Sequence, residues 1–291
     1  MTADATLVGT VRTWGRMVKF SHSLFAIPFA FAGATLAAAE HGITRAQVAW
    51  IVLAMVGARN AAMGFHRLAD ERIDARNPRT ADRELPRRRV SRAAVWVLTL
   101  ALTALFALAT YRLGLLPLLP VALLIVFGYS YTKRFTWASH FVLGLALAMA
   151  PVGGWLAVGG TVSWTVVALA AAVLLWVAGF DVIYACQDVE FDRRERLHSI
   201  PARFGIPAAL AVTRASHAGA LAALAAVGLV ADMHSVYWLG WCCILALLAW
   251  EHRLVRADDL SKVGVAFFNM NGVISVVYFA TVLAAVLIGH R

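Results

Sequence analysis

Charged residues are scarce in this 291-residue chain, since only 14% of residues are Asp, Glu, Lys or Arg whereas 61% are apolar. A soluble domain of this length has about 25% charged and about 45–50% apolar residues. Three cysteines, two of them adjacent, provide no disulfide framework. The alternating pattern of barrel strands is also missing. The composition excludes a soluble domain and leaves helices as the structures that satisfy backbone hydrogen bonds in lipid.

Apolar runs long enough, or nearly so, to cross a membrane recur along the whole sequence. We therefore expect an all-α integral membrane protein with about nine transmembrane helices, forming a single domain over residues 1–291. Pro117 and Pro120 interrupt the fourth run. The runs cover residues 22–38, 47–65, 93–110, 114–131, 138–158, 164–185, 207–230, 236–251 and 263–288.

The net charge of +10 is distributed unevenly between the loops. It gathers before the first run and after every even-numbered run, whereas the opposite loops and terminus have only Arg45, Arg112 and Arg291. By the positive-inside rule the N-terminus and the basic loops are cytoplasmic. We expect a multi-pass protein of a bacterial cytoplasmic membrane and no nucleic-acid partner. Residues 12–39 also resemble a signal peptide, but a first span completes the nine-span topology.

Three aspartates occupy the end of the sixth run and the segment after it. Asp181, Tyr184, Asp188 and Asp192 follow one another at intervals of three, four and four residues, so they share one face of a helix. A carboxylate at membrane depth is disfavoured by about 2.5–3.5 kcal/mol and usually faces a bundle interior. Three carboxylates on one face repel one another unless a cation lies among them.

A second acidic stripe ends the second run. His66, Asp70 and Asp74 are spaced by four residues on one helix face, and an arginine-rich loop follows, as one also follows the first stripe. Both Asp-x-x-x-Asp pairs therefore lie at cytoplasmic helix ends. This correspondence suggests two related halves, residues 1–135 and 136–291, around a central cavity that opens near the cytoplasmic face.

The paired carboxylates suit a shared hard cation, and Mg²⁺ typically takes one or two carboxylates together with substrate phosphates and water. The charges of four carboxylates and two Mg²⁺ ions cancel, so a diphosphate with a charge of about −3 leaves a negative surplus. Basic side chains must offset this surplus. Such a site beside an apolar cavity fits a polyprenyl diphosphate. The expected metal ligands are Asp70, Asp74, Asp188 and Asp192.

Two other interpretations concern the same residues. The acids could form internal salt bridges, such as Asp70 with Arg67 or Asp192 with Arg196, although two pairs at one membrane face favour a metal site. The end of the fourth run has two tyrosines, and a Lys-Arg pair follows them. This segment is compatible both with an aromatic belt beside a basic loop and with a set of anion ligands.

Two segments resemble the aspartate-rich motifs of the UbiA superfamily of intramembrane prenyltransferases. HRLADERIDARNPRTADRELP, residues 66–86, is similar to the first motif, N-x-x-x-D-x-x-x-D, and DVIYACQDVEFD, residues 181–192, to the second, D-x-x-Y-x-x-x-D-x-x-x-D. GYSYTKR resembles the family's tyrosine and Lys-Arg segment. The resemblance covers essentially the whole chain and implies Mg²⁺-dependent transfer of a prenyl group from a diphosphate to an aromatic or other acceptor.

One position departs from the family pattern, because the first Asn of the motif falls on His66. Imidazole is a poor Mg²⁺ ligand compared with an amide oxygen. Either His66 hydrogen-bonds the diphosphate or the first metal ion is held more loosely.

KFSHSLFAIPFAF and IDARNPRTADRELP look most like bacterial 4-hydroxybenzoate polyprenyltransferase-type enzymes, which include a menaquinone subgroup of the futalosine route. The acceptor implied is therefore a small hydroxyaromatic acid, either 4-hydroxybenzoate or a dihydroxynaphthoate, in ubiquinone or menaquinone biosynthesis. The Pro-Ile-Gly of the classical benzoate enzymes is missing, so both acceptors stay open. The sequence specifies neither the prenyl length nor the oligomeric state.

The remaining site residues are expected to bind the two substrates. Lys133, Arg72 and Arg134 are the expected diphosphate ligands beside the Mg²⁺ ions. Asp181 is expected to accept the hydrogen bond of the acceptor hydroxyl. Aromatic rings would stabilise the allylic cation, and the candidates are Tyr129, Tyr131 and Tyr184. A cation would pair with the acceptor carboxylate, and the candidates for this role are Lys19, His22 and Arg59.

Other classes of function compete with this hypothesis. Intramembrane acids also relay ions in coupled carriers, but here they lie near one face and no matched pair of broken helices stands out. A structural or lipid-binding protein would leave the aspartate pairs unexplained. Prenyl transfer to haem or to a lipid remains an alternative within the enzyme hypothesis.

Overall fold

The structure, a computed structural model, describes residue 17 and residues 26–265 and 270–289. This part of the chain is all-helical and has no strand, as the composition predicts. Its nine helices of 14 or more residues are α2 (Ala26–His41), α3 (Arg45–Arg76), α4 (Arg92–Arg112), α5 (Leu119–Thr132), α6 (Ser139–Ala157), α7 (Trp164–Ala185), α10 (Ile206–Val230), α11 (Ser235–Leu254) and α13 (Asn271–Gly289).

Six helical stretches are long and apolar enough to cross a membrane, and they lie in α3, α4, α6, α7 with its extension to Arg194, α10 and α13. The helices α2 and α5 have only 16 and 14 described residues. Pro117 and Pro120 account for the short α5, because they divide this segment into the 3-10 turn η2 (Leu116–Leu118) and the helix. Length and composition therefore support six of the nine expected spans, and the count of nine stays a prediction.

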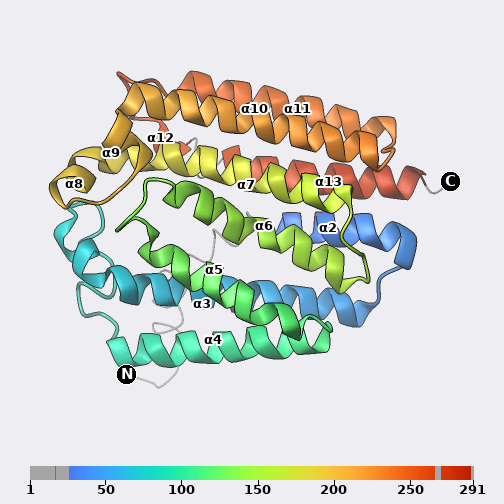
Figure 1. Cartoon of the computed structure of the whole chain (residues 1–291), viewed down its shortest axis with the longest axis horizontal. Coiled ribbons are helices and arrows are strands. Elements are labelled where there is room, and N and C mark those ends of the chain that lie inside the picture. Colours follow the sequence, from blue (N-terminus) through green and yellow to red (C-terminus); the bar gives the residue numbers. More distant parts are fainter. Residues whose placement is uncertain (1–16, 18–25, 266–269, 290–291) are drawn as a thin grey trace, which may run out of the picture.

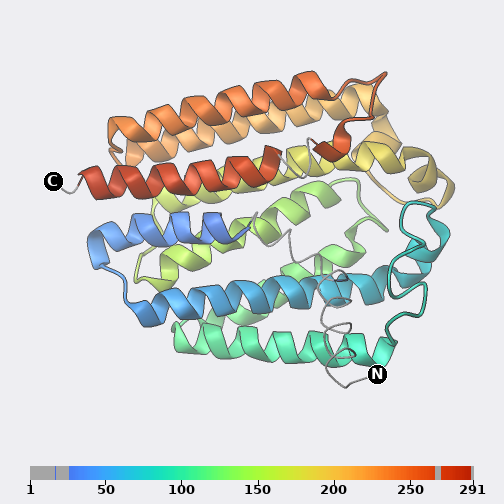
Figure 2. The same cartoon turned by 180° about the vertical axis from the view of Figure 1, so that it is seen from behind.

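The long helices run side by side along the longest axis of the molecule (Figures 1 and 2). The loops rich in arginine gather at one end, on the left of Figure 1, together with the short helices α8 (Val189–Arg194), α9 (Ile200–Phe204) and α12 (Val263–Val265). We call this end, which contains residues 77–91, 133–138, 186–205 and 255–262, the basic end. The clustering of the loops agrees with the alternation of loop charge in the sequence.

Close contact between helices in the centre of the bundle depends on small residues. A Cβ atom on Gly154 of α6 would overlap the carbonyl oxygen of Ala30 in α2, and one on Gly33 would overlap that of Pro151. A Cβ atom on Gly144 would likewise overlap the carbonyl oxygen of Leu174 in α7. In lipid such close backbone packing is a main source of helix association. These contacts fix α6 between α2 and α7.

The helix α7 is the most buried of the six candidate spans, and it leads into the second acidic segment at the basic end. The α-helical hydrogen bonding ends at Ala185, a 3-10 turn η3 follows over Cys186–Asp188, and α8 begins at Val189. The expectation of one uninterrupted α-helical stripe was therefore wrong. The tighter 3-10 turn changes the direction of Asp188 and Asp192 relative to Asp181.

Candidate functional site

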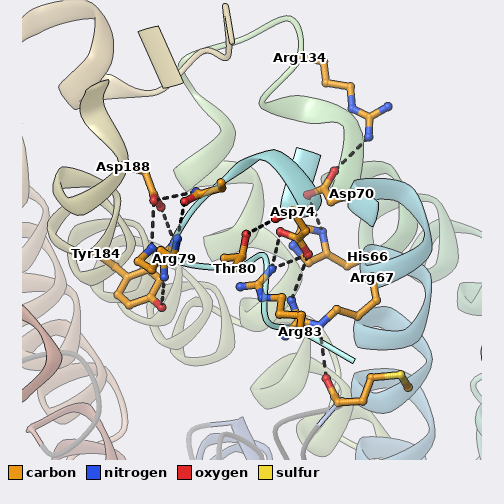
Figure 3. Close-up of polar contacts among 12 residues, drawn as sticks. His66, Arg67, Asp70, Asp74, Arg79, Thr80, Arg83, Arg134, Tyr184 and Asp188 are labelled. Carbon is orange, nitrogen blue, oxygen red and sulfur yellow. Dashed lines mark hydrogen bonds and ion pairs between the residues drawn. The ribbon is translucent and has the colours of Figure 1, made fainter. Parts of the chain in front are cut away.

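The first acidic pair lies in the last turns of α3, where both carboxylates bind arginines. Asp74 is buried and accepts hydrogen bonds from Arg83 Nη1 at 2.6 and 2.7 Å, and Arg67 Nη1 lies 3.8 Å from its Oδ2 (Figure 3). Asp70 accepts a hydrogen bond from Arg134 Nη2 at 3.0 Å. Each carboxylate of this pair is thus neutralised by a cation from a loop or a neighbouring turn.

The second acidic pair is held by residues that come from other segments. Asp188 Oδ1 accepts hydrogen bonds from Asn77 Nδ2 at 3.0 Å and Arg79 Nε at 2.9 Å, and Arg79 Nη2 binds the other oxygen (Figure 3). Arg79 also donates to the Tyr184 hydroxyl at 2.6 Å and lies over its ring. The loop after α3 therefore reaches across to the end of α7 and joins the two motifs.

The other member of this pair, Asp192, binds the loop between α5 and α6. Its side chain is 1% exposed, and Lys133 Nζ lies 3.0 and 3.2 Å from its two oxygens. The backbone carbonyl of Lys133 accepts a hydrogen bond from His198 N at 2.7 Å, beyond α8. Two independent contacts therefore tie Lys133 to the second acidic segment.

Asp181 lies four residues before the end of α7 and has a different kind of partner. Its Oδ2 lies 2.7 Å from Nδ1 of His140, a fully buried residue in the first turn of α6. The Tyr129 hydroxyl on α5 interacts electrostatically with both Asp181 and Asp70. Asp181 therefore faces the same interior region of the bundle as the first pair.

The four predicted metal ligands lie at the same end of the bundle, but they do not converge. In the part of the chain that the structure describes, no group of three or more His, Cys, Asp or Glu side chains is arranged to hold a metal ion. The predicted salt bridges also paired the wrong residues, because Asp70 binds Arg134 and Asp192 binds Lys133. Asp70 and Asp192 therefore do form ion pairs within the protein, but their partners are distant in sequence.

The donor set nevertheless fits Mg²⁺. It consists of aspartate carboxylates together with the amide side chain of Asn77, which already lies against Asp188, and Mg²⁺ prefers such hard oxygen donors. His66 lies beside this set, with its Nδ1 3.5 Å from Asp70 Oδ2 and its ring 5.7 Å from that of Tyr129. The position of His66 suits a hydrogen-bonding role better than a metal-binding role.

The two predicted tyrosines of α5 lie on different faces of that helix. Tyr129 lies beside His66, whereas Tyr131 is 41% exposed, contacts Phe65 and lies beneath the Arg134 guanidinium. Tyr131 is thus separated from the other predicted aromatic residues. Arg59 is seven residues before His66 on α3 and so lies on the same helix face, deeper in the bundle. Lys19 and His22 lie outside the described residues.

A hollow of about 370 Å³ opens at the basic end between α3 and the loops that follow α5 and α8. Four arginines line it, with Glu195 as the acidic residue, and Glu195 binds Arg76 at 2.9 Å. Arg196 adopts a left-handed backbone with φ of 56°, which is unusual for a residue with a side chain. Because four arginines and one glutamate line the hollow, its net charge is positive and suits an anion. Its arginines are Arg72, Arg76, Arg134 and Arg196.

The electrostatics of Arg79 favour its charged form. Partial burial lowers the pKa of this guanidinium, but the hydrogen bond and the charge of Asp188 outweigh burial and raise the pKa above its ordinary value. Arg79 therefore stays cationic at any working pH and holds the Asp188 carboxylate in a fixed orientation.

Sequence reasoning missed several residues of the site. Asn77, Arg79 and Arg83 belong to the segment that follows the first acidic stripe, and His140 belongs to neither stripe. The position of the three loop residues, directly after the first motif, was a usable signal. His140 had none, because its role depends on the contact of α6 with α7.

Known proteins resemble this chain over most of its length. A protein of Nitrosospira multiformis called 4-hydroxybenzoate octaprenyltransferase is 29% identical over 248 residues, which cover 84% of this chain and 85% of the relative. One of Xanthomonas campestris pv. campestris with the same name is 32% identical over 217 residues, covering 74% and 72%. The profile of the UbiA prenyltransferase family matches residues 26–273.

Solved structures have the same fold. The apo structure of a UbiA homolog from Aeropyrum pernix K1 superposes with a TM-score of 0.82 at 31% identity, covering 90% of this chain and 97% of that one. A UbiA homolog from Archaeoglobus fulgidus bound to GPP and Mg²⁺ has a TM-score of 0.76 at 18% identity, covering 94% and 99%. The second likeness concerns the fold alone.

The apolar helices and the aspartate pairs at one end define a multi-pass membrane protein with an oxygen-rich polar site. The chain belongs to the UbiA prenyltransferase family. It is therefore an enzyme that transfers prenyl groups, as the two motifs predicted.

Proposed function

We propose that this enzyme transfers a polyprenyl group from a polyprenyl diphosphate to a small hydroxyaromatic acid in ubiquinone or menaquinone biosynthesis. The observation that carries the proposal is the joining of the two aspartate-rich segments by Asn77 and Arg79, which brings acids and cations together at one end of an apolar bundle. The names of the curated relatives support a benzoate-type acceptor.

The charge balance of the site supports diphosphate binding. The site contains five aspartates and five cations. Arg67 and Arg83 share Asp74. Arg134 binds Asp70, Arg79 binds Asp188 and Lys133 binds Asp192, whereas Asp181 binds a histidine. In such a network the arginines can pass from a carboxylate to a diphosphate, because each offers pairs of anionic oxygens for bidentate hydrogen bonds. The site can therefore exchange internal ion pairs for a bound substrate.

We propose that Asp70, Asp74, Asp188 and Asp192 hold two Mg²⁺ ions together with the diphosphate. When bound, Mg²⁺ neutralises the negative charge that develops on the departing diphosphate. The UbiA homolog from Archaeoglobus fulgidus was solved with GPP and Mg²⁺ bound, which supports the choice of this metal.

Basic side chains complete the diphosphate site. Lys133 and Arg134 project from the loop after α5, and Arg72 lies in the arginine-lined hollow beside them. Cations placed before the reaction begins stabilise charge in the transition state without reorganisation. We assign diphosphate binding to these three residues and to Arg79 and Arg83, and we assign His66 a hydrogen bond to the same group.

The interior aromatic residues and Asp181 serve the transfer itself. The rings of Tyr129 and Tyr184 stabilise the allylic cation after the C–O bond breaks, in a region that excludes water. The ring carbon ortho to the acceptor hydroxyl attacks the cation and then loses its proton to the released diphosphate, while Asp181 accepts the hydrogen bond of the hydroxyl. Arg59, deeper on α3, binds the acceptor carboxylate, a role that Lys19 and His22 can share. Tyr131 lies apart from the rings of Tyr129 and Tyr184 and contacts the Arg134 guanidinium instead.

The orientation follows from the charge of the loops. We propose nine spans, an N-terminus and a basic end in the cytoplasm, and a bacterial inner membrane as the location. The two halves, residues 1–135 and 136–291, would each supply one aspartate pair to a cavity between them.

The experiment uses purified protein in detergent with labelled geranyl diphosphate. The acceptors 4-hydroxybenzoate and 1,4-dihydroxy-6-naphthoate are tested separately, each with Mg²⁺ and with EDTA. Metal-dependent prenylation of one acceptor is the expected result, and it identifies the acceptor. Folded protein that prenylates neither acceptor, also with a longer polyprenyl diphosphate, would contradict the proposal.

A further inference from the structure

His140 is the residue that contacts Asp181 most closely, and its other ring nitrogen is also engaged. Nδ1 lies 2.7 Å from Asp181 Oδ2, while Nε2 accepts a hydrogen bond from the backbone N–H of Ile200 at 3.4 Å. The imidazole is fully buried. One side chain of α6 thus connects the end of α7 to the first residue of α9.

These two contacts determine the tautomer of His140. A backbone N–H can only donate, so Nε2 must have a free lone pair. In a neutral imidazole the single proton then resides on Nδ1, and it is donated to the Asp181 carboxylate. A doubly protonated ring would direct a second N–H at the N–H of Ile200. The geometry therefore describes a neutral His140 that donates to Asp181.

The neutral partner makes Asp181 different from the other four acids of the site. Asp70, Asp74, Asp188 and Asp192 each bind an arginine or a lysine. Among these five acids, all within the described part of the chain, Asp181 is the one that has a histidine but no arginine or lysine as its ion-pair partner. It keeps its full negative charge, which disfavours a diphosphate and favours a hydrogen-bond donor.

The contact also fixes which carboxylate oxygen is available. Oδ2 is occupied by His140, whereas Oδ1 has no hydrogen-bond partner among the residues that the structure describes. Asp181 is 19% exposed at its side chain and interacts with the Tyr129 hydroxyl across the interior. Oδ1 can therefore accept one hydrogen bond from the hydroxyl group of a molecule bound in that region.

We propose that His140 is a positioning residue for the acceptor: its Nδ1–H holds Asp181 so that Oδ1 accepts the hydrogen bond of a phenolic hydroxyl. The proposal rests on the proposed prenyl transfer to a hydroxyaromatic acid. It explains why a histidine is buried without a charged role. It also gives Ile200 a function, since the hydrogen bond from its N–H to Nε2 keeps the ring proton on Nδ1.

Two substitutions separate the two ring contacts of His140. The side-chain amide of His140→Asn can occupy the position of Nδ1 and still donate to Asp181, but it cannot reach Ile200. The longer amide of His140→Gln reaches toward Ile200 and loses the donor to Asp181. The variant His140→Gln is expected to lower kcat about 10- to 100-fold. The variant His140→Asn is expected to keep most of the turnover, and the KM for prenyl diphosphate is expected to stay near its original value in both.

An Asp181→Asn background provides the control. If His140 acts through Asp181, neither His140 substitution changes kcat further in that background. The opposite ranking, with His140→Gln active and His140→Asn inactive, would assign the effect to Ile200 and overturn the proposal. An equal loss in the two variants, or an undiminished loss in the Asp181→Asn background, would overturn it as well.

A spectroscopic measurement tests the same contact without turnover. In protein labelled with ¹⁵N-histidine, the signals of His140 are identified by their disappearance in His140→Asn. The nitrogen shifts of a neutral Nδ1–H ring are expected, and an Nε2–H or doubly protonated ring would contradict the proposal. If the protein prenylated no hydroxyaromatic acid yet showed the expected tautomer, the proposed function would fail while the contact stood.

Discussion

The side-chain amide of Asn77 donates a hydrogen bond to Asp188 Oδ1 at 3.0 Å and joins two segments that are 111 residues apart. Asn77 directly follows α3 and Asp188 ends the turn η3, so this bond links the two aspartate-rich segments. Both residues are 7% exposed, and water cannot readily replace a lost partner at that depth. The relative position of the two motifs therefore depends on a residue outside either aspartate pair.

The variant Asn77→Ala is expected to lower kcat/KM for prenyl diphosphate about tenfold, because Asp188 loses one of its hydrogen bonds and part of its orientation. Steady-state kinetics at saturating acceptor measure the effect. The control is Asp82→Asn, in the same loop but largely exposed and bound to Arg87. Equal kinetics in the two variants would show that the link does not position the site.

The variant Asp188→Asn retains the shape of the side chain and removes its charge. Activity is expected to fall by about 100-fold or more, since a carboxylate ligand of the proposed Mg²⁺ is lost. Expression and elution in detergent should stay those of the unmodified protein. Asp258→Asn, an exposed acid bound to Arg256, is the matched control and should be as active as the original. Undiminished turnover in Asp188→Asn would refute a metal role for this residue.

The pair of Lys133 and Asp192 provides a test of burial. The Asp192 side chain is 1% exposed while Lys133 is 36% exposed, so Lys133→Met leaves an almost fully buried carboxylate without a partner. The free energy of unfolding is expected to fall by about 1–3 kcal/mol. The double variant Lys133→Met with Asp192→Asn removes the charge and should regain most of the thermal stability, but not the activity. A single variant that melts like the original protein would contradict the buried pair.

Two neighbouring glycines of α6 test the close contact with α2. A Cβ atom on Gly154 would overlap the backbone of Ala30, whereas one on Gly153 meets no atom within 4 Å. The variant Gly154→Ala is expected to destabilise the protein by about 1–3 kcal/mol, because two backbones must separate. In contrast, Gly153→Ala should be neutral or stabilising by up to about 1 kcal/mol, since alanine favours a helix. Thermal melting in detergent compares the two, and equal melting temperatures would argue against the contact.

Much of the fold could be predicted from hydrophobicity alone. The run 164–185 coincides with α7, Trp164–Ala185, because a long apolar segment in lipid has to be helical. The length of α5 was overestimated where Pro117 and Pro120 separate a 3-10 turn from the helix. The uninterrupted stripe from Asp181 to Asp192 was also wrong, since spacing in the sequence does not reveal where a helix tightens.

The site could be predicted as a set of residues but not as a set of contacts. Spacing by four residues identified both pairs, Asp70 with Asp74 and Asp188 with Asp192. The partners of these acids were predicted to be near in sequence, yet Asp192 binds Lys133 from 59 residues away. Side chains that long and flexible bind whichever opposite charge the helix packing brings near them.

Hydrophobicity, residue spacing and the order of charges along the chain specify a helical membrane protein with acid pairs at one end. The same local properties, together with the two motifs, identify its family. The contacts of Asn77 and Arg79 with Asp188 and of His140 with Asp181 appear only in the folded bundle. Those contacts depend on how α3, α6 and α7 pack, and the packing is set by surfaces that meet only when the whole bundle forms.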